Sequence, residues 1–209
     1  MTHTELCQLA VAWLRRPPSR GGHACQVAVA ETRTGWEGEI PDAIGYKSTG
    51  GPASGTVVVE CKVSRADFLA DRHKPHRSSG GVGDWRYFMA PEGLIAMDEL
   101  PERWGLVTVN QRGHLKTVRG VYQCSNYYLQ DERRQAMRQE SDRMREMFLI
   151  VRLFARIQDP DTAISAIKER DRLQGKYNDM ENKLRQMQWE VNHLRCSLEW
   201  AQKEAAPAC

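Results

Sequence analysis

Two stretches decide the fold of this chain: Pro41-Asp42, and Val57-Val58-Val59-Glu60-Cys61-Lys62 further along. Side chains alternate along a strand, so Glu60 and Lys62 share one face and the alternate valines point the other way. Charged groups on a Val-rich strand are costly to bury unpaired. A divalent cation would remove this cost, because Asp42, Glu60 and the Cys61 carbonyl are hard oxygen ligands suited to Mg²⁺. A salt-bridge cluster on an exposed sheet face is the alternative.

The sequence on both sides of these stretches predicts an α/β domain. A helix begins at Thr2, which forms a capping box with Glu5, and ends at Pro17-Pro18. A short helix capped by Ser64 follows the motif strand. Strands are expected at 25–30, 40–45, 56–62, 85–90, 105–110 and 114–119. This order favours a mixed sheet covered by helices.

A longer succession of residues narrows the assignment. Glu60-Cys61-Lys62-Val63-Ser64-Arg65-Ala66-Asp67-Phe68-Leu69-Ala70-Asp71-Arg72 is followed by Trp85-Arg86-Tyr87-Phe88-Met89-Ala90-Pro91-Glu92-Gly93 and Leu100-Pro101-Glu102-Arg103-Trp104-Gly105-Leu106. With Pro41-Asp42, this pattern resembles the PD-(D/E)XK nuclease superfamily, and within it the MmcB-like DNA-repair nucleases and their phage and prophage relatives. The resemblance covers residues 25–119. It implies a restriction-endonuclease-like core, in which a central mixed sheet is flanked by helices.

The resemblance also implies roles for individual residues. Asp42 and Glu60 correspond to metal ligands, with the Cys61 carbonyl beside them, and Lys62 corresponds to the catalytic lysine. A fourth acidic residue often lies upstream in such nucleases, and Glu31 is the first candidate, ahead of Glu5 and Glu39. Ser64, Asp67 and Asp71 match the helix after the motif and receive no chemical role.

The implied function is Mg²⁺- or Mn²⁺-dependent hydrolysis of DNA phosphodiester bonds, in DNA repair, recombination or phage DNA metabolism. RNA is an alternative substrate, because the chemistry at phosphorus ignores the 2′-OH unless a site reads it. The competing hypothesis is a catalytically inactive member of the fold. Such a chain would be a phage-encoded module that binds nucleic acid or a host protein and dimerises through its C-terminal helices.

A basic loop follows the motif helix and is the candidate for contacts to the nucleic-acid backbone. The residues assigned to this role are Arg65, Arg72, His73, Lys74, His76 and Arg77. Lysine and arginine position a phosphate backbone without reading sequence. The spacing of the two histidines also suits zinc, but no CxxC or second histidine pair completes four ligands. A plain solvated loop is the remaining alternative.

The last third of the chain is helical by composition. Residues 123–159 are expected to form a helical segment, with a long helix over 126–158 whose apolar cluster 148–154 packs on residues 1–122 or on a partner subunit. Residues 160–209 carry a heptad pattern, and the seam positions are Leu173, Tyr177, Met180, Leu184, Met187, Val191, Leu194, Leu198 and Ala201. This pattern favours a homodimer or higher homo-oligomer through 165–204, with a helix pair inside one chain as the alternative.

Composition excludes several classes of protein. Thirty basic residues against 27 acidic ones give a net charge of only +3, so any DNA contact must come from a local surface. The sequence has no signal-peptide pattern and no apolar run long enough to span a bilayer. Its six cysteines lack CxxC spacing, as expected of reduced thiols. We therefore expect a protein of the bacterial or phage-infected cytoplasm that does not interact with membranes.

Overall fold

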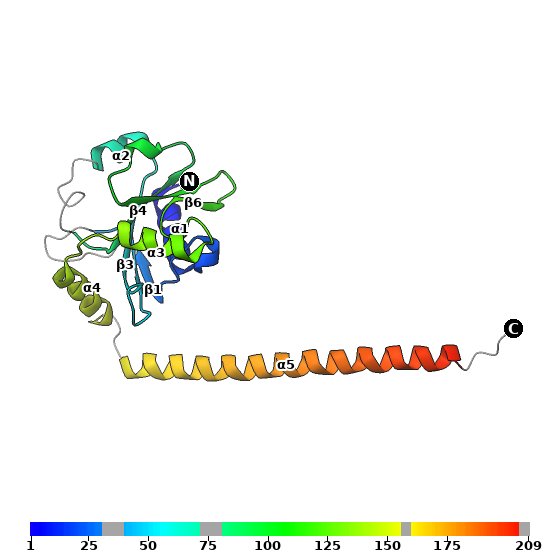
Figure 1. Cartoon of the computed structure of the whole chain (residues 1–209). Coiled ribbons are helices and arrows are strands. Elements are labelled where there is room, and N and C mark those ends of the chain that lie inside the picture. Colours follow the sequence, from blue (N-terminus) through cyan, green and yellow to red (C-terminus); the bar gives the residue numbers. More distant parts are fainter. Residues whose placement is uncertain (31–39, 72–80, 156–159, 205–209) are drawn as a thin grey trace. The chain divides into compact units, whose positions relative to one another are not determined.

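The computed structural model describes residues 1–30, 40–71, 81–155 and 160–204, which divide into two compact units, Met1–Leu153 and Phe154–Cys209. The first unit holds the sheet of Figure 1. Its strands are β1 (Val27–Ala30), β2 (Ala43–Lys47), β3 (Gly55–Cys61), β4 (Trp85–Pro91), β5 (Trp104–Val109) and β6 (Leu115–Arg119). Its helices are α1 (His3–Arg15), η1 (Pro18–Arg20), α2 (Arg65–Asp71), η3 (Met97–Glu99), α3 (Tyr127–Ala136) and α4 (Arg143–Ala155), and α5 (Pro160–Glu204) follows in the second unit.

The six strands of the described chain lie in the sheet in sequence order. β1, β2 and β3 form an antiparallel meander, β4 and β5 run parallel to β3, and β6 returns antiparallel to β5. The expected mixed α/β sheet is therefore confirmed. β3 is the strand at which pairing changes from antiparallel to parallel, and it carries the Glu60 and Lys62 motif at its carboxyl end.

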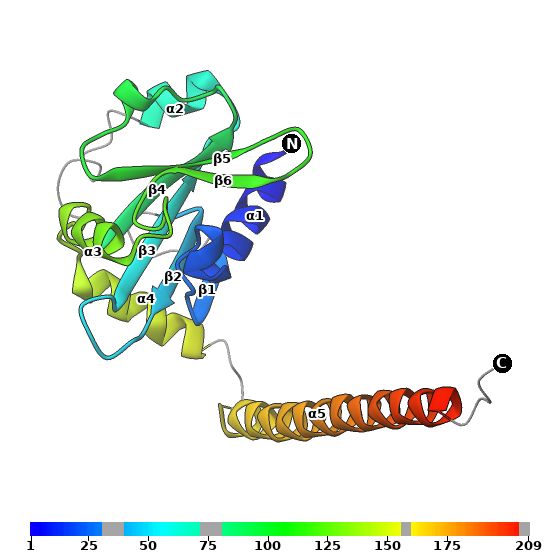
Figure 2. The same cartoon turned by 45° about the vertical axis from the view of Figure 1, so that its right-hand side comes forward.

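Each face of the sheet has its own core. α1 packs on one face, where its Leu6, Trp13 and Leu14 meet the inward side chains of β3 and β4. Figure 2 shows α1 alongside β1 of the meander, and it shows α2 and α4 near opposite ends of the sheet. On the opposite face, Phe68 of α2 packs edge-on against Phe88, and Leu149 of α4 joins a separate apolar cluster beneath β2 and β3.

Local chemistry explains where the first elements begin and end. The capping box is present, because the Thr2 hydroxyl accepts from the Glu5 amide and the Glu5 carboxylate accepts from the Thr2 amide. β2 begins at Ala43 instead of residue 40. Pro41 has no N–H to donate to a neighbouring strand. At Asp42 it is the side-chain carboxylate that accepts the hydrogen bond from the Cys61 amide of β3.

The continuous helix expected over 126–158 is wrong. The chain forms α3, capped by the Asn126 side chain, and α4, whose first turn is capped by Asp142. Between them the backbone amides of Gln139 and Asp142 donate to carbonyls of Asp84 and Gly81, just before β4. These contacts with the sheet replace the helical hydrogen bonds, and the first unit therefore extends beyond residue 122.

The second unit is the helix α5. All of the heptad seam side chains that the structure describes, Leu173 to Leu198, are more than half exposed. Among the described residues, none of the helices combines the length and the apolar composition that crossing a bilayer requires.

Candidate active site

The end of β3 and the start of β2 bring the two motif halves together. In the register of these antiparallel strands Ala43 lies opposite Val59, so Asp42 reaches the level of Glu60. The Cys61 amide donates a hydrogen bond of 2.7 Å to Asp42 Oδ2. This bond ties the carboxylate to the backbone of the motif strand. The pairing of Asp42 with the Glu60 segment follows from topology, although 17 residues separate them in sequence.

Lys62 is a buried lysine surrounded by carboxylates. Its Nζ lies 3.4 Å from Asp71 Oδ2, 3.7 Å from Glu60 Oε2 and 3.9 Å from Asp67 Oδ1. Its backbone amide donates to the Met89 carbonyl, which continues the pairing with β4 beyond the end of β3. The ammonium group is thus fixed from two sides, by the strand that carries it and by the helix that follows.

The helix after the motif supplies two of these carboxylates. Ser64 accepts a hydrogen bond from the Asp67 amide through its hydroxyl, which confirms it as the cap of α2. One helical turn separates Asp67 from Asp71, so both reach back towards the end of β3. Their position beside Lys62 gives these residues a role that sequence reasoning could not assign. The i, i+4 spacing of Asp67 and Asp71 was the feature of the sequence that could have indicated this shared position.

The Asp42 carboxyl is electrostatically strained. Burial is the main cause of its raised pKa, and the negative charge of Glu60 raises the pKa further. The Cys61 amide, Lys62 and His3 act in the opposite direction without cancelling the rise. Two carboxylates that repel one another at a partly buried position are the donor set that a divalent cation relieves. The residues present therefore fit a hard cation between Asp42 and Glu60.

α1 adds a second set of contacts to Asp42. His3 Nε2 lies 3.3 Å from Asp42 Oδ1, and Cys7 Sγ lies 3.6 Å from His3 Nδ1. These three residues form a cluster that could hold a metal ion. Imidazole and thiol are softer donors than Mg²⁺ prefers, so we assign His3 the role of positioning Asp42. This contact could not be predicted from the sequence, because it joins the first helix to the residue that precedes the second strand.

The Cys61 side chain lies on the opposite face from Glu60 and Lys62. Its thiol is buried under α1, and hydrogen bonding with Cys7 followed by burial raises its pKa far above the ordinary range. A thiol held in its protonated form is a poor ligand. Any contribution of this residue to a metal site must come from its carbonyl oxygen, as the sequence predicts.

Several predicted site residues have other contacts or lie outside the described residues. Glu5 caps α1, and this hydrogen bonding with Thr2 lowers its pKa. Arg65 forms an exposed ion pair with Glu99 and donates to the Leu94 carbonyl. The remaining candidates fall outside the described ranges: Glu31, Glu39, Arg72, His73, Lys74, His76 and Arg77. Trp85 and Tyr87 are buried in the core between the sheet and α1.

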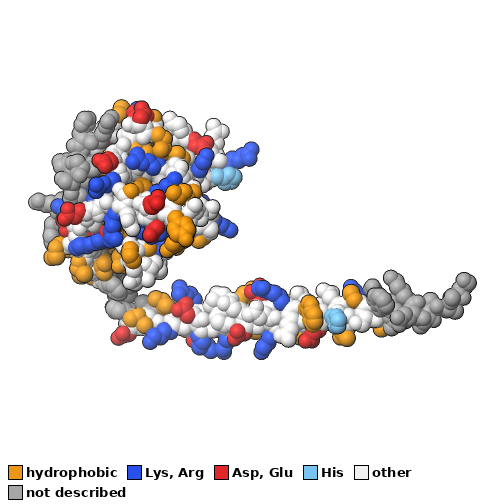
Figure 3. Space-filling view, in the orientation of Figure 1, with side chains coloured by type: hydrophobic (Ala, Val, Ile, Leu, Met, Phe, Trp, Pro, Cys, Tyr) orange, Lys and Arg blue, Asp and Glu red, His pale blue; other side chains and the backbone are white. Residues whose placement is uncertain are grey.

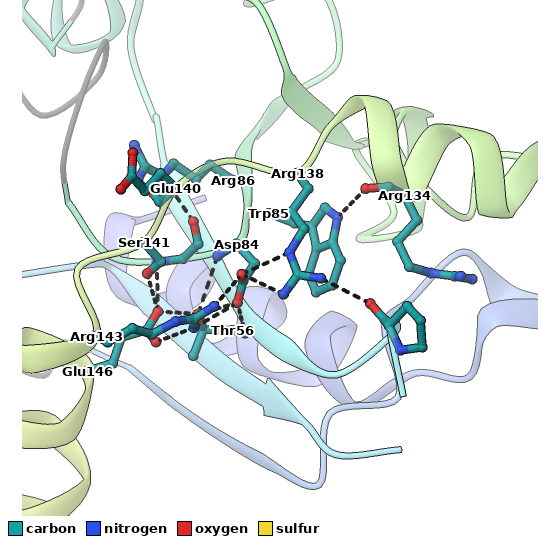
Figure 4. A network of polar contacts seen from close by, with 12 residues as sticks. Thr56, Asp84, Trp85, Arg86, Arg134, Arg138, Glu140, Ser141, Arg143 and Glu146 are labelled. Atoms are coloured by element: carbon teal, nitrogen blue, oxygen red, sulfur yellow. Dashed lines mark hydrogen bonds and ion pairs between the residues drawn. The ribbon is translucent and has the colours of Figure 1, made fainter. Parts of the chain in front are cut away.

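A buried polar network lies at the other end of β3 and β4 and was missed by sequence reasoning (Figure 4). Asp84 accepts from the Thr56 amide at 3.0 Å and pairs with Arg138 at 3.0 Å and Arg143 at 2.7 Å. Burial raises the pKa of Asp84, but hydrogen bonds from Arg143 and Thr56 outweigh it and hold the pKa below the ordinary value. The network fastens α4 to the sheet, and its role is structural.

Comparisons with known proteins assign neither a family nor a function to the chain. No family model matches the chain, and no curated protein matches it. A solved structure of a protein of unknown function from Silicibacter pomeroyi is similar to it, with a TM-score of 0.48 and 21% identity. The similarity covers 77% of this chain and 94% of that one.

Proposed function

We propose that the first unit is a metal-dependent nuclease that hydrolyses DNA phosphodiester bonds. One observation carries this proposal: burial and the negative charge of Glu60 raise the pKa of the Asp42 carboxyl at the end of β3, and Lys62 lies 3.7 Å from Glu60. The resemblance of the same residues to the PD-(D/E)XK motif supplies the reaction and the choice of DNA.

The chain's residues have separate roles in this reaction. Asp42, Glu60 and the Cys61 carbonyl hold the cation, which, when bound, acts as a Lewis acid on phosphate and on the attacking water. Lys62 holds a positive charge where negative charge develops on the phosphoryl oxygens. Asp71 and Asp67 keep its ammonium in place at 3.4 and 3.9 Å. His3 and the Cys61 amide orient the two oxygens of Asp42.

The test is a cleavage assay with the purified full-length chain. Supercoiled plasmid, linear duplex, branched duplex, single-stranded DNA and RNA are incubated with Mg²⁺, with Mn²⁺ and with EDTA. We expect metal-dependent cleavage of DNA, reduced about a hundredfold or more by Asp42→Asn, Glu60→Gln or Lys62→Met. The matched control is Glu102→Gln, a solvent-exposed carboxylate on the same unit, which should leave the rate unchanged.

Four outcomes would contradict the proposal. No cleavage of any substrate, or equal cleavage by the Lys62→Met variant, would refute the assigned site. Binding of DNA without cleavage under every metal condition would favour the inactive binding module. Cleavage of RNA alone would support the assigned site and contradict the proposed DNA substrate.

A further inference from the structure

The helix α5 carries a long apolar seam that is exposed in the single chain. Its eight described members are Leu173, Tyr177, Met180, Leu184, Met187, Val191, Leu194 and Leu198, with exposed fractions between 51 and 69%. Figure 3 shows hydrophobic side chains along this helix, interspersed with charged ones. A 45-residue helix with an uncovered stripe does not obtain its stability from propensity alone. The seam therefore requires a partner.

The spacing of the seam assigns each residue to a heptad position. Alternating steps of four and three place Tyr177, Leu184, Val191 and Leu198 at position a, and Leu173, Met180, Met187 and Leu194 at position d. Leucine at d and a β-branched residue at a favour two-stranded parallel coils, and this seam has leucine at two of its four d positions and valine at one of its four a positions. The a position one heptad before Tyr177 is Arg170, which pairs with Asp171 in its own helix, so the seam begins at Leu173.

Charges beside the seam identify the partner. Positions g are Lys176, Lys183 and Glu190, and positions e are Glu181, Gln188 and Arg195. In a parallel, in-register pair each g residue faces the e residue five positions later on the other helix. Lys176 then meets Glu181, Lys183 meets the neutral Gln188, and Glu190 meets Arg195. Both charged combinations are attractive, and each occurs twice by symmetry.

Other arrangements of the same helices are less favourable. The antiparallel pair with the greatest overlap sets Tyr177 against Leu194 and brings only Lys183 and Glu190 together. Sliding a parallel pair by one heptad brings Lys183 against Arg195 on one side and against Glu181 on the other. Shifted antiparallel pairs set Glu181 or Glu190 against its own copy, while bringing Lys176 to Glu190 or Glu181 to Arg195. The parallel, in-register pair has the most attractive contacts, four, and none between like charges, so it is the favoured arrangement.

We propose that α5 pairs with α5 of a second copy of this chain as a parallel, in-register, two-stranded coiled coil. The outward face of the helix is left to solvent, and Trp189 stacks there on His193 with ring centroids 5.4 Å apart. Because the first unit precedes α5 in both chains, the two first units attach at the same end of the coil. This inference does not depend on the proposed nuclease activity.

The oligomeric state is the first measurement. Sedimentation equilibrium of the full-length chain at several concentrations should give twice the mass of one chain. Introducing Asp at Leu184 and at Val191, in the middle of the seam, should give a monomer whose first unit keeps the near-ultraviolet circular dichroism of the wild type. A monomeric wild-type chain would overturn the proposal and would favour a helix pair within one chain or no pairing at all.

Disulfide trapping distinguishes the two directions. The background replaces Cys124, Cys196 and Cys209 by Ser, and Tyr177→Cys and Leu194→Cys are then made separately. In a parallel in-register coil each variant alone forms a covalent dimer on oxidation, since equal a or d positions face one another. Cross-linking only in a mixture of the two variants would demonstrate an antiparallel pair and refute the proposed direction.

Charge reversal tests the register. Lys176→Glu sets like charges against Glu181 at two places and should weaken dimerisation about tenfold or more. Combining it with Glu181→Lys should restore affinity, although Glu181 also pairs with Arg185 in its own helix at 3.2 Å. The matched control is Lys168→Glu, which makes the same charge change before the seam begins. Equal effects of Lys176→Glu and Lys168→Glu would contradict the assigned register.

Discussion

His23 provides a pH-dependent test of how the first unit is packed. The ring is fully buried among Trp13, Tyr87 and Tyr122, and its Nε2 lies 2.8 Å from the Tyr87 hydroxyl. The Val121 amide donates to the same hydroxyl at 3.1 Å. We assign the hydroxyl proton to the His23 side, which makes Nε2 the acceptor. Protonation of the ring would turn Nε2 into a donor, and the Tyr87 hydroxyl would then have to rotate its own proton away.

The size of the pH-dependent loss of stability follows from the lowered pKa of His23. Burial, aided by the positive charges of Lys47 and Arg134, lowers the pKa of His23 from 6.5 to about 3. The unfolded chain takes up a proton below pH 6.5 and the folded chain does not, so stability falls as the pH falls through this window. Linkage gives a loss of about 2 kcal/mol between about pH 7 and pH 5. For a unit of this size the melting temperature should fall by about 4–8 °C.

The assay is urea unfolding at several pH values, followed by near-ultraviolet circular dichroism, for the wild type and for His23→Gln. The glutamine oxygen can accept from Tyr87 but cannot titrate. We expect this variant to be less stable at neutral pH by about 1–3 kcal/mol and insensitive to pH in the same window. A wild-type stability that stays flat, or an equal pH dependence in both proteins, would refute the reasoning.

Three further predictions concern the site and its support. Asp84→Asn removes the buried carboxylate that pairs with the partly exposed Arg138 and Arg143, and it should lower the free energy of urea unfolding by about 1–3 kcal/mol. Asp42→Asn should stabilise the metal-free chain at neutral pH, because a raised pKa makes the ionised native form unfavourable. The gain should decline as the pH falls through the raised folded pKa and vanish below the ordinary value of 3.8. Mg²⁺ should raise the melting temperature of the wild type more than that of the variant. Thr2→Ala should cost about 1 kcal/mol in thermal melts through loss of the α1 cap, and Glu5→Gln should retain full cleavage activity.

Much of the fold could be predicted because its signals are local. The capping box of α1 and the alternation along β3 are written in neighbouring residues, and both are present in the structure. The break between α3 and α4 could not be predicted from residues 126–158. It depends on backbone hydrogen bonds to residues before β4, which lie more than fifty positions away in sequence.

The candidate site, like the fold, could be predicted from the sequence only in part. The shared face of Glu60 and Lys62 follows from strand alternation, and the structure brings them within 3.7 Å. The contact of His3 with Asp42 required the packing of α1 on the sheet, and no pattern near either residue indicates it. Glu5 was a candidate only because it is acidic. Its hydrogen bonds with Thr2 at the start of α1 account for the residue as part of the helix cap.

The topology explains why the charges gather at this edge of the sheet. β3 runs antiparallel to β2 and parallel to β4, so the residue that precedes β2 must meet the residues that end β3. The next element, α2, starts at the same edge and returns Asp67 and Asp71 to Lys62. In open α/β sheets, ligands bind outside the carboxyl ends of strands where the strand order reverses, and this edge has the related property that the direction of pairing changes. The repulsion between Asp42 and Glu60 is therefore imposed by the fold on any sequence with acids at these two positions. The stabilisation expected of Asp42→Asn in the metal-free chain measures that electrostatic cost directly.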